Sequence, residues 1–180
     1  GVEVFSEEYW KIVENFVRTA VKRKCNMLLT PVFTPPLDTA IGGERRTVQL
    51  VDVHVTENGY TFGFDKFERW VDMCKRCGIK YYEISHLFSQ WGATMAPKVM
   101  GEKDGELVQL FGWDTEAAGK EYSEFLHQFL AALKPELEKL GISEVAYFHI
   151  SVEPSRVQFD SYKAAKEVVE KDLQGYHMMD

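Results

Sequence analysis

The sequence predicts an α/β fold that is part of a (β/α)8 barrel, with about three to four βα units. Helical and strand patterns alternate along the chain, which indicates parallel strands joined by right-handed crossover helices. Two long segments, 34–64 and 88–114, each follow a predicted strand and precede a helix, whereas the helix-to-strand turns are short. Because long βα loops build the functional face of a barrel, this asymmetry favours a barrel over a doubly wound sheet.

The length fits only part of such a barrel. The 180 residues correspond to one domain, but a complete barrel takes about 250 residues. The first pattern in the chain is a helix and the last is a strand, as in an excerpt of a longer multidomain enzyme. We therefore expect residues 1–180 to form a partial barrel. An open parallel sheet leaves unpaired strand edges, so contact with further barrel strands or with a second copy is expected.

The first half of the chain predicts two helices and two strands. The first helix begins after the N-cap residue Ser6 and carries apolar residues at helical spacing along one face. Residues 26–33 (NMLLTPVF) predict a short buried strand that ends near its proline. Asp65 suits the N-cap of the second helix, and Gly78 marks its end before a strand at 80–87.

The two long segments differ in their predicted content. Segment 34–64 contains a β-hairpin, because alternating valines precede Asn58-Gly59 and an aromatic run follows it. Segment 88–114 is rich in Gly, Trp and Met and is expected to be a loop.

The second half of the chain repeats the alternation. The longest helix covers about 115–140, with an internal proline, and Gly141 ends it. Residues 145–151 (VAYFHIS) predict a third strand. A fourth helix covers about 160–174, and residues 175–179 begin a fourth strand.

Composition excludes several classes of protein. The net charge of −7 argues against nucleic-acid binding, and the absence of a run of about 18 apolar residues argues against a membrane span. No metal-ligand spacing, glycine-rich nucleotide motif or nucleophile elbow occurs, so we expect no metal and no cofactor. Aromatic residues make up 13%, which fits a large core and also a site that stacks on sugar faces.

The cysteines bear on the compartment and on redox chemistry. The odd number of cysteines and the lack of a visible signal peptide slightly favour the cytoplasm, while a truncated N-terminus would allow secretion or a periplasmic location. Cys74 and Cys77 have CxxC spacing inside a periodic helix. We interpret them as small buried residues rather than a redox or zinc site.

Polar side chains lie at the C-terminal ends of the first three predicted strands. They are Thr30 and Thr34, then Glu83, Ser85 and His86, then His149, Ser151 and Glu153. A strand-end carboxylate followed by Pro154 is the arrangement expected of a general acid. The alternatives are that Glu153 caps a helix, that Glu83 bonds within the sheet, and that both histidines are simply packed.

Three short runs carry a resemblance to a known family. Residues 82–88 (YEISHLF), 90–93 (QWGA) and 96–98 (APK) together resemble glycoside hydrolase family 123. That resemblance implies a β-N-acetylgalactosaminidase with a (β/α)8 catalytic barrel. Residues 148–151 (FHIS), followed by Glu153-Pro154, resemble the family's catalytic strand end, where an Asp-Glu pair precedes proline. The resemblance extends from about residue 26 to residue 174.

The resemblance also implies a mechanism, from which this sequence departs at one position. It implies retaining, substrate-assisted hydrolysis through an oxazolinium intermediate, with Glu153 as general acid and base. The preceding residue, expected to be an aspartate that stabilises the oxazolinium, is Val152. Loss of such a partner costs about 10²–10³ in rate, so we expect an impaired site.

The same resemblance suggests residues that bind the sugar. Trp91 would stack on the sugar ring, and His86, Lys98 and Trp113 would line its pocket with Glu83 and His149. The expected partner is a glycan or glycolipid that ends in β-linked N-acetylgalactosamine. Trp91 and Trp113 also fit loop anchors. The alternative functions are a non-hydrolytic carbohydrate-binding domain and a scaffold for assembly.

Overall fold

The computed structural model describes residues 1–36, 40–90, 92–151 and 155–179. In chain order the helices and strands are α1 (Glu7–Lys22), β1 (Met27–Thr30), β2 (Asp52–Thr56), β3 (Gly59–Gly63), α2 (Asp65–Cys77), β4 (Tyr81–Ile84), β5 (Val99–Lys103), β6 (Glu106–Phe111), α3 (Lys120–Lys139), β7 (Ala146–His149), α4 (Phe159–Val169) and β8 (His177–Met179). Short 3-10 turns precede β7, at Ser143–Val145, and α4, at Arg156–Gln158.

Four strands form a parallel sheet in the order β1-β4-β7-β8. Each of the first three strands is followed by a segment that contains one helix (α2, α3 and α4 in turn) and then by its neighbour in the sheet. This is the arrangement of consecutive βα units. The predicted alternation and the strand at 175–179 are therefore confirmed, while closure into a barrel stays a prediction.

The two long segments together form a second sheet, in the order β3-β2-β5-β6. The hairpin β2–β3 is confirmed, with Thr56 paired to Gly59 at its turn. The expectation that 88–114 is a loop is wrong, because it holds the hairpin β5–β6. The turn of that hairpin is Asp104-Gly105, and both residues have positive φ, 53° and 82°. An Asp-Gly pair favours such a turn, so the sequence did contain the signal.

Helix ends follow the local sequence, with three corrections. Ser6 caps α1, since its Oγ accepts from the Tyr9 amide at 3.2 Å, and Gly78 ends α2 with φ 98°. Asp65 is not the N-cap of α2 but its first residue, where a carboxylate suits the helix dipole. Helix α3 begins only at residue 120, and α4 ends at residue 169. Both are shorter than their apolar patterns predict, because apolar residues in the adjoining turns also pack inward.

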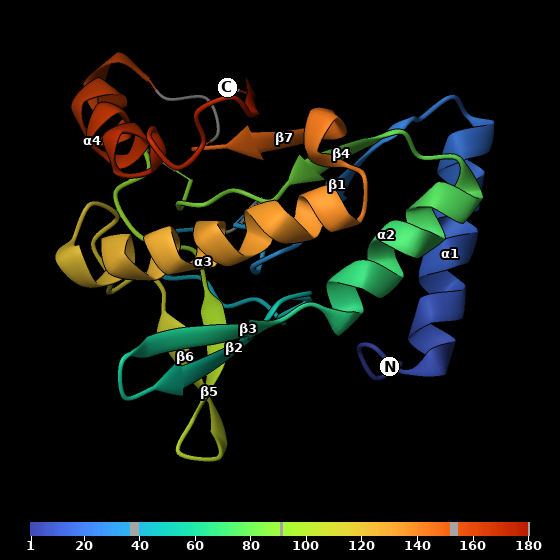
Figure 1. Cartoon of the computed structure of the whole chain (residues 1–180), viewed down its shortest axis with the longest axis horizontal. Helices are drawn as coiled ribbons and strands as arrows, with labels where there is room; N and C mark the ends of the chain where they lie inside the picture. The colour runs from blue at the N-terminus through green and yellow to red at the C-terminus, as the bar shows by residue number, and fades with distance from the viewer. Residues whose placement is uncertain (37–39, 91, 152–154, 180) are drawn as a thin grey trace.

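Helix α3 packs against both sheets and gives them one core. Figure 1 shows it running between the second sheet and the strands β1, β4 and β7. Phe125 and Phe129 are fully buried and contact Phe33, which follows β1, and Phe62 on β3. Such ring pairs add about 0.5–1.5 kcal/mol each beyond the burial of area. The helix thereby holds the second sheet in place beside the ends of the parallel strands.

Two findings bear on predicted absences. No helix within the described ranges is long and apolar enough to cross a bilayer. Cys74 is buried, and burial raises the pKa of its thiol to about 12, which leaves it protonated and unreactive at neutral pH.

Candidate active site

The C-terminal ends of β1, β4 and β7 meet at one edge of the parallel sheet. The Ser85 amide, just past β4, donates to the Thr30 carbonyl at 3.0 Å, and the Leu87 amide donates to the His149 carbonyl at 3.3 Å. Ser85 and Thr30 are completely buried. Of the polar residues singled out at the three strand ends, Thr30, Ser85 and His149 are thus brought together at one place.

Glu83 and His149 form a hydrogen-bonded pair across β4 and β7. Glu83 Oε1 lies 2.9 Å from His149 Nε2, and the side chains are 27% and 13% exposed. The imidazole lowers the pKa of the Glu83 carboxyl, against the opposing effect of burial. Ionised Glu83 accepts the Nε2 proton of His149. That tautomer turns Nδ1 of a neutral imidazole into an acceptor.

His86 stacks on His149. The ring centroids are 4.4 Å apart and the planes differ by 24°. The pKa of His86 is lowered to about 4, mainly by burial and also by the neighbouring His149, while Glu83 opposes the shift. His86 is therefore neutral at neutral pH. Its Nδ1 is buried and has no hydrogen-bond partner among the residues that the structure describes. An unpaired buried nitrogen costs about 1–3 kcal/mol.

Lys98 and Trp113 lie in a second cluster, where their polar atoms hold the segment 43–45. Lys98 Nζ pairs with the Glu44 carboxylate and donates to the Arg45 carbonyl at 2.9 Å. Trp113 Nε1 donates to the Gly43 carbonyl at 3.1 Å. In this structure both residues build the wall of a pocket rather than present free donors to it.

The two long segments face each other across that pocket. Its lining consists of Thr34, Pro35, Pro36, Gly43, Glu44 and Arg45 on the first segment, with Ser89, Ala96, Pro97, Lys98, Gln109, Gly112 and Trp113 on the second. Ser89 connects the pocket to the strand ends, because its carbonyl accepts from Ser151 Oγ, just past β7, at 3.0 Å. Arg45 and Gln109 were not expected here. Each lies in a long βα segment, but no motif marks either residue.

Three predicted site residues, Glu153, Val152 and Trp91, lie outside the described residues. The chain is described up to Ser151 and again from Ser155, whose amide donates to Gln158 Oε1 at 2.9 Å. The roles of these three residues remain predictions. In the part of the chain that is described, no group of three or more His, Cys, Asp or Glu side chains is placed to hold a metal ion.

A parallel sheet whose strand ends carry a carboxylate–imidazole pair beside a pocket is typical of an α/β enzyme domain. Residues 1–180 match the family model described as "Glycoside hydrolase 123, catalytic domain". The chain belongs to glycoside hydrolase family 123, and the resemblance seen in the sequence is confirmed.

The structure is also similar to a solved one, described as a family 123 glycoside hydrolase from Clostridium perfringens in a study of glycolipid glycan hydrolysis. The TM-score is 0.68 at 13% sequence identity, over 96% of this chain and 29% of that one. At this identity the likeness supports the fold alone, and the chain spans less than a third of that protein. A comparison with curated protein sequences gave no significant match.

Proposed function

We propose that this chain is part of the catalytic barrel of a retaining glycoside hydrolase that releases β-linked N-acetylgalactosamine by substrate-assisted catalysis. The observation that carries the proposal is the match of residues 1–180 to the family's catalytic domain. Four parallel strands joined in turn by three helices support a barrel, in which further strands would cover the open edges of β1 and β8. The glycolipid glycan in the description of the similar structure supports a glycan or glycolipid substrate.

The proposed chemistry needs one carboxyl group and the substrate's own acetamido group. Glu153 protonates the glycosidic oxygen while the acetamido carbonyl oxygen attacks C1, so that the C1–O bond breaks and an oxazolinium ion forms. Ionised Glu153 then takes a proton from water, which attacks C1 and restores the acetamido group with retention. Glu153 follows Ser151 by two residues, and Ser151 is bound to Ser89 on the pocket wall.

The carboxylate–imidazole cluster is suited to hold the sugar. Glu83 orients His149, which can hydrogen-bond a sugar hydroxyl, and neutral His86 stacks on the His149 ring and supports it from behind. Trp91 is proposed to stack on the sugar ring, and Lys98 and Trp113 to wall the pocket next to it.

Val152 is expected to limit the rate. It lies where the family resemblance places an aspartate beside the oxazolinium ion. A valine offers neither charge nor hydrogen-bond acceptor, and a missing electrostatic partner costs about 10²–10³ in rate. The test is hydrolysis of an aryl β-N-acetylgalactosaminide by the intact protein with Val152 and with Val152→Asp. A gain of about 10²-fold or more in the Asp variant, abolished by adding Glu153→Gln, is the expected result.

A second candidate function is carbohydrate binding without hydrolysis, and Val152 is the observation that favours it. The same experiment separates the two functions. If both proteins fold, bind N-acetylgalactosamine and fail to turn over, the hydrolase proposal is wrong and the binding function replaces it. Turnover with Val152 within tenfold of the Asp variant would instead show that residue 152 is not the stabilising position.

A further inference from the structure

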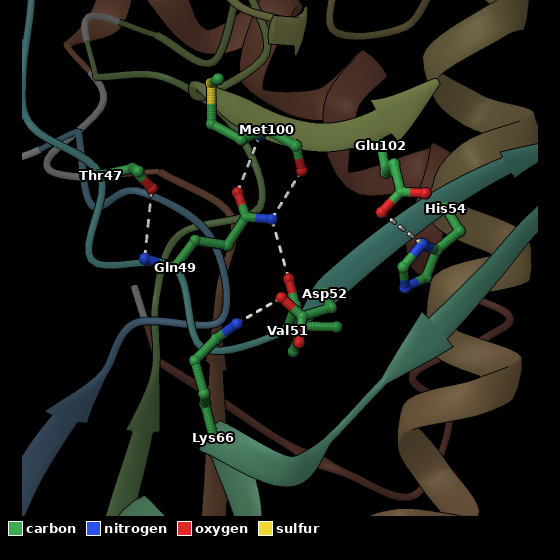
Figure 2. A network of polar contacts seen from close by, with 8 residues as sticks. All are labelled: Thr47, Gln49, Val51, Asp52, His54, Lys66, Met100 and Glu102. Atoms are coloured by element: carbon green, nitrogen blue, oxygen red, sulfur yellow. Dashed lines mark hydrogen bonds and ion pairs between the residues drawn. The ribbon is translucent and has the colours of Figure 1, made fainter. Parts of the chain in front are cut away.

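The buried side chain of Gln49 joins the two long βα segments (Figure 2). Its Nε2 donates to the Val51 carbonyl at 2.8 Å and to the Met100 carbonyl at 2.7 Å, and its Oε1 accepts from the Met100 amide at 2.9 Å. The residue is only 7% exposed. The side-chain amide therefore both donates to and accepts from Met100, 51 residues away on the second segment, while its other donor bond goes to Val51 on its own segment.

This amide takes the place of strand pairing. β2 and β5 are parallel neighbours that pair at His54 and Glu102. Gln49 precedes β2, and its side chain offers the Met100 backbone the donor and acceptor that a neighbouring peptide group would supply. Loss of the side-chain amide would leave the Met100 amide and two carbonyls without these partners, which destabilises the contact between the segments.

The same network reaches the pocket. The backbone N–H of Gln49 donates to Thr47 Oγ1 at 3.2 Å, and Thr34 Oγ1 donates to that oxygen at 2.9 Å. Thr34 lines the pocket, and its own amide donates to the Lys98 carbonyl at 3.3 Å. Met100, the partner of Gln49, is two residues beyond Lys98. Gln49 is therefore connected to both walls of the pocket, although it is not itself a lining residue.

Two ion pairs in the same region contribute less than the Gln49 hydrogen bonds to holding these segments together. His54 Nδ1 and Glu102 Oε2 are 3.6 Å apart, and both side chains are about half exposed, at 44% and 54%. Lys66 pairs with Asp52 near the start of β2, also at the surface (Figure 2). Exposed pairs of this kind contribute little to stability, because water and salt screen the charges. The buried amide is the stronger connection.

We propose that Gln49 is a positioning residue that sets the distance between the two walls of the pocket and thereby the affinity for substrate. The inference rests on the proposed function only in taking this pocket as part of the substrate site. Glu83 and His149, which are proposed to hold the sugar that is cleaved, lie at the ends of the parallel strands, outside this network. Loosening of the walls should therefore weaken binding more than it slows the chemical step.

The test compares Gln49→Met with Gln128→Met in the intact protein. Methionine keeps the length of the side chain and removes its hydrogen bonds. Gln128 is a matched control, because its Oε1 also accepts from the backbone of another element, the Tyr60 amide at 2.9 Å, but on β3, away from the pocket. Two readouts are needed: amide hydrogen exchange over 43–50 and 96–103, and the separate values of kcat and KM, in the Val152→Asp background if turnover requires it.

In Gln49→Met we expect faster exchange in both segments and a KM raised about fivefold or more with kcat within about twofold, and in Gln128→Met neither change. Unchanged exchange in the two segments, or faster exchange with an unchanged KM, would overturn the proposal. Absence of turnover in every protein would count against the proposed function, while the exchange data would still decide whether Gln49 holds the walls. If Gln49→Met fails to fold, the isosteric Thr47→Val removes one arm of the network, and a KM unchanged in that variant would refute the inference.

Discussion

The buried histidine His86 makes the stability of the fold sensitive to mild acid. Its folded pKa is about 4, against 6.5 for an ordinary histidine, because burial disfavours the charged ring. Between these values the unfolded chain binds the proton and the folded chain does not. The free energy of unfolding is therefore unaffected by His86 above about pH 6.5 and decreases as the pH drops toward 4.

The size of this effect follows from the two pKa values. At pH 7.5 the imidazole is neutral in both the folded and the unfolded chain, so its titration does not affect stability. At pH 5 protonation of the unfolded chain favours unfolding by about 2 kcal/mol. Removal of the titrating group should abolish that part of the loss. We expect His86→Phe, which keeps a flat ring over His149, to lose about 2 kcal/mol less than the parent protein between pH 7.5 and pH 5.

The assay is urea unfolding at the two pH values, with His54→Phe as the control. His54 is 44% exposed, and its replacement should leave the acid sensitivity within about 0.5 kcal/mol of the parent. The titration of the five histidines by NMR provides a second measurement, which needs no variant. An identical loss of stability in parent and His86→Phe, or the absence of a histidine that titrates well below pH 6, would refute the reasoning.

Three further predictions concern the site, the core and one turn. Glu83→Gln removes the charge that orients His149 and should lower kcat/KM about tenfold in an active background; an unchanged value in a folded protein would contradict that role. Phe125→Ala empties the core shared by both sheets and should cost about 3–5 kcal/mol in urea unfolding, whereas Phe16→Ala, at a side chain 72% exposed, should cost less than about 0.5. Gly105→Val forces a β-branched residue to φ 82° and should cost about 1–2 kcal/mol; equal stability would mean that the turn is remodelled.

The elements that the sequence predicted correctly are those with local signals. The apolar face of α3, the cap at Ser6 and the turn at Gly78 each depend on residues within a few positions of one another. The hairpin β5–β6 had an equally local signal in Asp104-Gly105. It was missed because Gly, Trp and Met around it suggested a loop. Its strands also alternate less clearly, since Leu107 of β6 is exposed whereas Phe111 of the same strand is buried.

The candidate site divides in the same way. Glu83 and His149 could be predicted to meet, because they lie near the ends of strands that follow one another in a parallel βα pattern. The pairing of Lys98 with Glu44 and Arg45 could not, since it depends on how two irregular segments 54 residues apart pack together. The presence of Arg45 and Gln109 in the pocket lining could not be predicted for the same reason. No periodicity or spacing specifies such a contact.

This division has a consequence for how the site works. The groups at the strand ends are held by the backbone pairing of β1, β4 and β7, which is cooperative with the whole parallel sheet. The pocket is held by few backbone contacts and by side chains, among them Gln49, Lys98 and Trp113, and each of these side-chain contacts is lost by a single substitution. Changes in the two long segments should therefore alter which glycan is bound while the chemical step is kept. Changes at the strand ends, by contrast, should impair every substrate alike.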